Sequence, residues 1–238
     1  MLTERERWLS AFHAANPGVT RRAWARGGSY ARVAARVVEA VGASARVLDL
    51  ACGDGALLEL LGPRAIGLDL SAAELALARG AVVQGRAQAL PFGDGAFDAA
   101  ACHLAFMLFD EVEVVVGELA RVLRPGAPFV ALVGGGPTAD GEDAFHAFAR
   151  AMPRSERRFG DRRASSEAGW RELFAGWGEV TFERWPIDLG GTFDEVWSFL
   201  STSYQLRDGE RVRELMLAAF PGEYVPFTVV TYLATVRR

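Results

Sequence analysis

Two short apolar segments, each containing an acidic residue where a strand would end, constrain this chain most strongly. The first, VLDLACGDG at 47–55, reads as a buried strand, a turn with glycine and the start of a helix. The second, IGLDLS at 66–71, reads as a strand ending on Asp69, twenty positions after Asp49. Glycines at such a turn let the backbone approach a ligand, and an acid after the next strand suits the hydroxyls of a ribose. The pair predicts a nucleoside-containing cofactor.

Two common nucleotide-binding motifs do not fit this turn. A dinucleotide fingerprint has glycines in the order G-x-G-x-x-G, whereas the corresponding positions hold Ala51, Gly53 and Ala56. A phosphate-binding P-loop needs a lysine, and this sequence has none. The spacing is instead D-x-A-x-G-x-G, and a tight turn in some other parallel α/β domain is the alternative that the residues alone leave open.

Composition narrows the class of protein. The 238 residues are 50% hydrophobic, with a net charge of −4, so no overall basic field would attract nucleic acid. The longest apolar run, at 99–109, is interrupted by His103 and is too short to span a membrane. The charged N-terminus lacks the apolar core of a signal peptide. We expect a cytoplasmic protein with no membrane span and no nucleic-acid partner.

Short strands alternate with helices through the middle of the chain, which predicts an α/β fold with a doubly wound, mostly parallel sheet. We expect one domain over residues 1–238, with N-terminal helices at 1–43, a cofactor-binding core at 44–137 and a variable cap with closing strands at 138–238. The predicted strands are 46–50, 65–69, 81–85, 97–102, 127–133, 179–189 and 226–236.

Side chains that can cap helices mark several helix starts. Ser71 with Glu74 forms a capping box for a helix that we expect to run through Arg79. Asp110 and Glu113 are expected to cap the helix before the strand at 127–133.

Three segments carry a resemblance to a known family. The segment 47–55 resembles the first motif of the class I S-adenosylmethionine-dependent methyltransferases. GRAQALPFGDGAFD at 85–98 is similar to their third-strand motif, and ELARVLRPG at 118–126 is similar to the helix and turn before their fifth strand. The combination is typical of the small-molecule branch related to ubiquinone and menaquinone methyltransferases. The resemblance implies a Rossmann-like, seven-stranded sheet in the order 3-2-1-4-5-7-6, with N-terminal helices and a helical cap.

The resemblance also implies roles for individual residues toward S-adenosylmethionine. Asp49 should orient the turn and the amino group of the cofactor, Asp69 should hold the ribose, and Leu70 should pack against the adenine. Tyr30, and more weakly Arg26, could reach the carboxylate, although Tyr30 may equally be a core aromatic of its helix. The methionyl end should be lined by Ala51, Cys52 and Gly53, with a backbone contact from His103.

Adenine recognition departs from the family pattern at one position. Arg86 stands where the family usually has an acid that accepts a hydrogen bond from the adenine amino group. An arginine cannot accept a hydrogen bond. The N–H of Ala87 could still bind a ring nitrogen, and Gln88 could supply an acceptor.

The expected function is methyl transfer from S-adenosylmethionine to a small, aromatic or apolar acceptor, with no metal because the histidines are isolated. His103 is the candidate catalytic residue, as a base or as a positioning group. A cofactor-binding protein without transfer activity is the alternative from another class. An RNA methyltransferase, which could use the arginine cluster at 154–163, is a further one. The sequence indicates neither the acceptor nor the oligomeric state.

The cysteines give one more geometric expectation. The first and fourth strands are neighbours in the expected sheet, and Cys52 and Cys102 lie near their carboxyl ends. We expect both to be free thiols that lie close together beside the cofactor.

Overall fold

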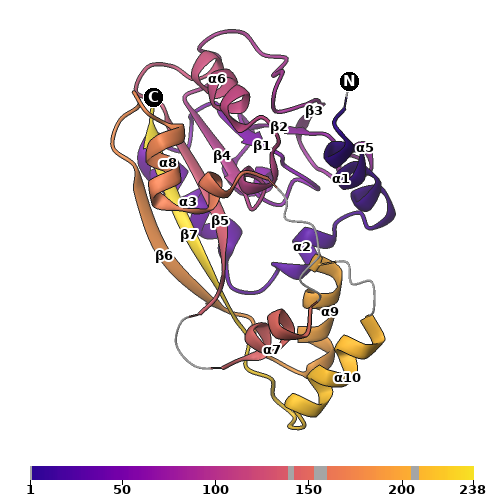
Figure 1. The fold of residues 1–238 in the computed structure, drawn as a ribbon. Helices are drawn as coiled ribbons and strands as arrows, with labels where there is room; N and C mark the ends of the chain where they lie inside the picture. Colours follow the sequence, from indigo (N-terminus) through magenta and orange to yellow (C-terminus); the bar gives the residue numbers. More distant parts are fainter. Residues whose placement is uncertain (1, 139–141, 153–159, 205–208) are drawn as a thin grey trace.

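The computed structural model describes residues 2–138, 142–152, 160–204 and 209–238. Its centre is a seven-stranded sheet in the order β3-β2-β1-β4-β5-β7-β6 (Figure 1). The strands are β1 (Val47–Leu50), β2 (Ile66–Asp69), β3 (Ala81–Gln84), β4 (Ala99–His103), β5 (Pro128–Pro137), β6 (Thr181–Asp188) and β7 (Thr228–Arg237).

The sheet is parallel from β3 through β5 and antiparallel at its far side, where β7 pairs with β5 and β6 pairs with β7. The predicted strand order and the mostly parallel arrangement are confirmed. Because the parallel strands run the same way, the segments that follow β1, β2 and β4 meet at one edge of the sheet, where ligands bind in such folds.

Helices cover both faces of the sheet. Apolar side chains of α3, including Val33 and Val37, pack against one face with Ala99 and Ala101 of β4. The opposite face, with Ala100 of β4, packs against α6 and α8. The helices are α1 (Glu4–Ala15), α2 (Val19–Ala23), α3 (Ser29–Val41), α4 (Leu58–Leu61), α5 (Ala72–Leu75), α6 (Val112–Val122), α7 (Ala144–Ala151), α8 (Glu167–Leu173), α9 (Phe193–Tyr204) and α10 (Gly209–Ala219), with short 3-10 turns η1 (Phe106–Leu108) and η2 (Arg162–Ser165).

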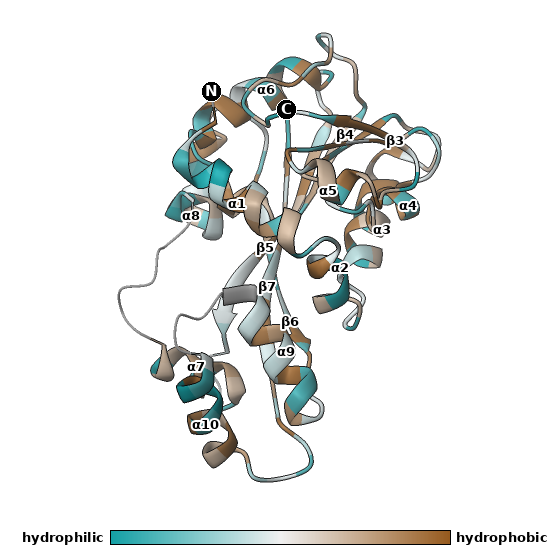
Figure 2. Cartoon of the chain, turned by 90° about the vertical axis from the view of Figure 1, so that its right-hand side faces the viewer, coloured by the Kyte–Doolittle hydropathy of each residue, from teal (hydrophilic) through white to brown (hydrophobic). Residues whose placement is uncertain are grey.

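Helices α7, α9 and α10 form a separate group at the far end of the long strands β5, β6 and β7 (Figures 1 and 2). Phe199 of α9 contacts Trp24, which follows α2, with ring centroids 5.3 Å apart, so this group touches the N-terminal helices. The segment 138–238 therefore supplies both the cap and the closing strands. The division of the chain into 1–43, 44–137 and 138–238 stays a prediction.

Two helix starts differ from the sequence prediction. Helix α6 begins after Glu111, which has a left-handed backbone and makes no side-chain cap, whereas Asp110 binds Thr3 and Arg5 of the N-terminal segment. Helix α5 has the predicted Ser71 cap but ends at Leu75, and Glu74 turns to α1 instead of closing a capping box.

Both cysteines are free, as predicted, and buried, but they lie on opposite faces of the sheet rather than side by side. Cys102 packs on the α6 face of the sheet. Cys52 lies over β2 on the opposite face, where a Cβ on Gly67 would come within 2.6 Å of its Sγ. The strand order is as expected; the left-handed backbone at Ala51 turns Cys52 to the other face.

Candidate functional site

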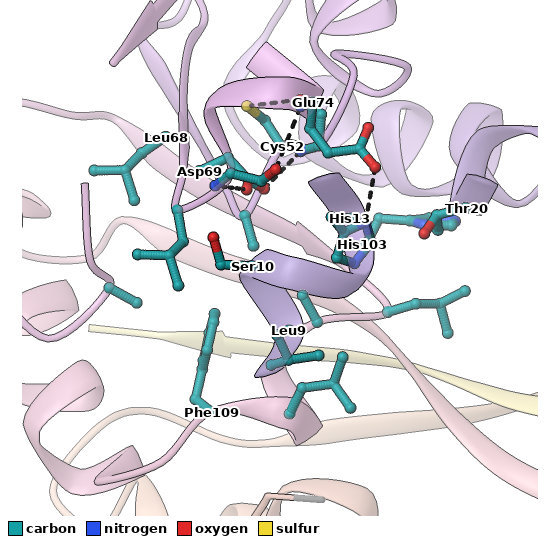
Figure 3. Close-up of a pocket in the computed structure, with 18 of the residues that line it drawn as sticks. Leu9, Ser10, His13, Thr20, Cys52, Leu68, Asp69, Glu74, His103 and Phe109 are labelled. Carbon is teal, nitrogen blue, oxygen red and sulfur yellow. Dashed lines mark hydrogen bonds and ion pairs between the residues drawn. The ribbon is translucent and has the colours of Figure 1, made fainter. Parts of the chain in front are cut away.

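A cavity lies at the carboxyl ends of β1, β2 and β4, between the sheet and α1 (Figure 3). Its empty volume is about 1130 Å³ with its open mouth included. The structure brings the predicted site residues to this cavity, with the exception of the weaker candidate Arg26, while their roles toward a cofactor stay predictions. These residues are Tyr30, Asp49, Ala51, Cys52, Gly53, Asp69, Leu70, Ala87, Gln88 and His103.

The turn after β1 has a strained backbone. Ala51 has a φ of 58°, a left-handed conformation in which a Cβ is unfavourable. Leu104, which follows β4 and lines the same cavity, has a φ of 56°. Strain of this kind gathers at functional sites, where the surrounding structure holds it in place.

The N–H groups of this turn are already engaged. Cys52 donates to the carbonyl of Leu68 at 3.0 Å, Gly53 donates to Asp69 Oδ2 at 2.8 Å, and Gly55 donates to the carbonyl of Cys52 at 3.0 Å. A turn that binds phosphate must offer such groups to its ligand. This turn therefore does not resemble a pyrophosphate cradle in its hydrogen bonding, which agrees with the missing glycines.

Asp49 is the most unusual ionisable group of the cavity. Its carboxylate is 1% exposed, and among the described residues neither oxygen has a hydrogen-bond partner. Burial, together with the nearby charge of Asp69, raises the pKa of Asp49 to about 8. A cationic donor placed beside it would satisfy both oxygens and lower this pKa.

Asp69 is held at the carboxyl end of β2. Its Oδ2 accepts from the N–H of Gly53 and its Oδ1 from the N–H of Ser71, each at 2.8 Å. Burial raises the pKa of this carboxyl above its usual range, against these two hydrogen bonds. Each oxygen keeps a free acceptor position, so Asp69 can take two further donors.

Two residues from the N-terminal helices lie at the Asp49 end of the cavity. Tyr30 stacks on His103 with ring centroids 3.8 Å apart, and burial, with the charges of Asp54 and Asp49, raises the pKa of its hydroxyl. Arg21 lines the cavity while paired with Glu59 at 2.9 and 3.1 Å.

The weaker carboxylate candidate, Arg26, is placed differently. It donates to the carbonyls of Leu189 and Gly190 and is absent from the cavity wall. The sequence analysis missed Arg21, because α2 is too short to show a periodic pattern.

His103, the last residue of β4, is buried among aromatic rings. Its Nε2 lies 2.9 Å from Ser29 Oγ, and its Nδ1 has no hydrogen-bond partner. Burial lowers the pKa of His103 to about 3, so the ring is neutral at physiological pH. Its free nitrogen accepts or donates one hydrogen bond according to the tautomer that Ser29 selects.

Helix α1 forms a wall of the cavity that the sequence did not reveal as part of the site. Leu9 and Ser10 project from it toward the space between Asp69 and Phe109 (Figure 3). Glu74 anchors its other end, since Glu74 Oε1 lies 2.7 Å from His13 Nδ1 and Oε2 accepts from the N–H of Gly18 at 2.9 Å. The capping box of Thr3 and Glu6 was the available sequence signal for this helix.

The segment after β3 faces the first turn of α1. Arg86 Nε donates to Glu6 Oε1 at 2.9 Å, and Nη2 forms an ion pair with the same oxygen at 2.9 Å. The Gln88 amide donates to the carbonyl of Asp110 at 2.9 Å. Ala87 is buried in the wall between them.

The arginine cluster near residue 160 is only partly described. Arg154, Arg157 and Arg158 lie outside the described residues. Arg163 is paired with Asp161, Glu113 and Glu172.

The donor set fits S-adenosylmethionine in its chemistry. The unpartnered carboxylate of Asp49 suits the amino group of the methionyl end. The free acceptor positions of Asp69 suit the hydroxyls of a ribose. Leu70, Ala87 and Leu108 supply apolar surface in the same wall.

Comparison with known proteins agrees with this chemistry. Residues 48–131 match the family described as methyltransferase domain. Demethylmenaquinone methyltransferase of Thermus thermophilus is 41% identical over 101 residues, which cover 37% of this chain and 46% of that protein. A 2-phytyl-1,4-naphtoquinone methyltransferase of Synechocystis is 36% identical over 98 residues, covering 34% and 41%. The chain thus matches about half the length of these curated relatives.

Solved structures share the fold over most of the chain. The YcgJ protein from Bacillus subtilis aligns with a TM-score of 0.61 and 20% identity, covering 87% of this chain and 98% of that one. Geranyl diphosphate C-methyltransferase from Streptomyces coelicolor, in complex with Mg²⁺, geranyl-S-thiolodiphosphate and S-adenosyl-L-homocysteine, aligns with a TM-score of 0.58 and 15% identity, covering 99% of both. The fold is that of the class I methyltransferases. In the part of the chain that the structure describes, no helix is long and apolar enough to cross a membrane.

Proposed function

We propose that this chain, which contains a class I methyltransferase domain, transfers the methyl group of S-adenosylmethionine to a small apolar or aromatic acceptor. The observation that carries the proposal is the buried, unpartnered carboxylate of Asp49 beside Asp69, at the carboxyl end of β1. A cofactor with a cationic amino group and a ribose would pair its amino group with Asp49 and donate its ribose hydroxyls to Asp69.

The charge of the cavity argues against phosphate-bearing cofactors. Asp49, Asp54, Asp69 and Glu74 all line the cavity, and the N–H groups of Cys52, Gly53 and Gly55 are occupied. A pyrophosphate here would meet negative charge and few donors. Nicotinamide dinucleotides are therefore expected to bind far more weakly than S-adenosylmethionine.

The residues of the chain contribute alignment rather than activation. S-adenosylmethionine supplies its own activated methyl group on a sulfonium, so holding the two reactants in line is the main task of the protein. Asp49 would fix the amino group, Asp69 the ribose, and α1 would exclude water from the wall that it forms. Because His103 is neutral, it would hold a polar group of the acceptor through Nδ1.

The acceptor class follows from the surface near His103. Tyr30 stacks on His103, and both line the cavity with Leu104, Leu108 and Phe109, while Trp24 and Phe199 belong to the core cluster. Aromatic walls with one polar group suit a flat, apolar molecule. The quinone substrates in the names of the relatives support reduced naphthoquinones as the first candidates, and the geranyl diphosphate enzyme supports isoprenoids as the second.

The test is transfer of radiolabelled methyl from S-adenosylmethionine to a panel of reduced naphthoquinones, phenols, isoprenyl diphosphates and transfer RNA. We expect product with a member of the first three classes and none with RNA. His103→Gln should raise the KM for the acceptor and leave cofactor affinity unchanged. A loss of about 10²–10⁴-fold in kcat alone would instead identify His103 as the base. Cofactor binding without transfer to any acceptor would support a non-catalytic binding protein.

A further inference from the structure

Arg86 brings a carboxylate from α1 to the far end of the cavity. Its Nε donates to Glu6 Oε1 at 2.9 Å, its Nη2 forms an ion pair with the same oxygen at 2.9 Å, and a second acid, Glu111, lies 3.7 Å from Nη2. Glu6 is only 7% exposed and lines the cavity with Arg86, Ala87 and Gln88. Burial of a carboxylate on a helix that is exposed on its other side is costly unless the carboxylate is paired or binds a ligand.

The hydrogen bonds of Glu6 leave one acceptor position open. A carboxylate accepts about four hydrogen bonds, two on each oxygen. Oε1 accepts from Arg86 Nε and is also in ion-pair contact with Nη2, and Oε2 accepts from the N–H of Thr3 at 2.7 Å. One position on Oε2 therefore stays free in the wall of the cavity.

We propose that Glu6 accepts a hydrogen bond from the exocyclic amino group of the adenine, with Arg86 as its positioning residue. This proposal rests on the proposed function. It supplies the acid that position 86 lacks, since the Arg86 side chain cannot accept but can hold an acceptor in place. Gln88 is the rival acceptor, since its Nε2 donates to the carbonyl of Asp110 and its Oε1 remains available to accept.

Adenine binding and the docking of α1 are then linked. The first turn of α1 is tied to the core through Thr3 and Arg5, which bind Asp110, and through Glu6. A base that bonds to Glu6 adds a contact that exists only when α1 is in place. Bound cofactor should therefore hold this helix against the cavity.

The test compares S-adenosylhomocysteine with S-inosylhomocysteine, in which a carbonyl replaces the amino group of the base. The wild-type protein should bind the adenosyl compound about 10–100-fold more tightly, because the carboxylate would otherwise face a carbonyl oxygen. In Glu6→Gln the ratio of the two dissociation constants should fall to about 3 or less, since an amide can donate to the carbonyl. Glu111→Gln, which removes the longer contact to Arg86, should keep the wild-type ratio.

Three results would overturn the proposal. One is a wild-type ratio near 1, which needs no variant and no assumption about its folding. Another is a Glu6→Gln protein that loses affinity for both ligands equally, because Glu6 then only fixes α1. The third is a wild-type protein that binds neither compound, and this result alone would also remove the proposed function.

Discussion

At the scale of single residues, Ala51 stores strain that a smaller residue would release. Its φ of 58° is costly for a residue with a Cβ, and glycine adopts it freely. Ala51→Gly should raise the free energy of unfolding by about 1 kcal/mol without weakening cofactor binding, as measured by urea denaturation. The matched control is Ala76→Gly, an exposed alanine with a φ of −65°, which should lower stability by about 0.5–1 kcal/mol. Equal losses in the two variants would contradict this interpretation of the turn.

Asp49 makes stability depend on pH in a direction opposite to that of most acids. Its pKa is about 8 in the folded chain, against an ordinary value of 3.8, so the folded state holds the proton more tightly. The unfolding free energy should therefore fall as pH rises from about 4 to about 8. Asp49→Asn cannot ionise and should remove this fall, and its advantage over the wild type should be largest above pH 8.

The measurement is a series of denaturation curves between pH 5 and pH 9. Asp194→Asn, at an exposed side chain of α9, serves as the control and should keep the wild-type profile. Parallel profiles for the wild type and Asp49→Asn would mean that Asp49 does not carry its proton in the folded protein.

At the scale of elements, α1 is held over the cavity by a few buried polar contacts. Glu74 accepts a hydrogen bond from the N–H of Gly18 and lies beside His13. Removing the Glu74 side chain therefore leaves the Gly18 N–H without this partner. Glu74→Ala should speed hydrogen exchange in residues 4–15 by about 10-fold or more and weaken cofactor binding. Glu59→Ala, which breaks the exposed pair with Arg21, should have little effect on exchange in α1. Unchanged exchange in Glu74→Ala would show that α1 is anchored elsewhere.

The elements of the core could be predicted from local sequence, and their ends less well. The strands at 47–50 and 66–69 lie where alternating apolar segments and turn glycines place them. Helix α5 is shorter than predicted, and Glu74 contacts His13, 61 positions earlier, instead of closing a capping box. Asp110 likewise caps no helix, since it binds the N-terminal segment. Contacts between distant segments determine the partners of Glu74 and Asp110, and no local sequence pattern predicts such contacts.

At the scale of the whole molecule, the sequence indicated one half of the site. The residues after β1, β2 and β4 are motif positions, and the sheet brings them together as predicted. The opposite wall, with Glu6, Leu9, Ser10 and His13, comes from a helix whose docking depends on its partners in the core. The cap was predictable only as a set of helices, because its place depends on packing such as that of Phe199 on Phe227.

Cofactor binding through Asp49 and Asp69 is tested most directly by isothermal titration. S-adenosylhomocysteine is titrated into the wild-type protein and into Asp69→Asn, in two buffers of different ionisation enthalpy. We expect one-to-one binding with release of up to about one proton near pH 7, because the ligand amino group lowers the raised pKa of Asp49. We also expect the affinity for S-adenosylhomocysteine to be about 10-fold or more lower in Asp69→Asn, because a charge-assisted hydrogen bond to the ribose is lost. Unchanged affinity in Asp69→Asn, or no binding by a folded wild-type protein, would contradict these expectations.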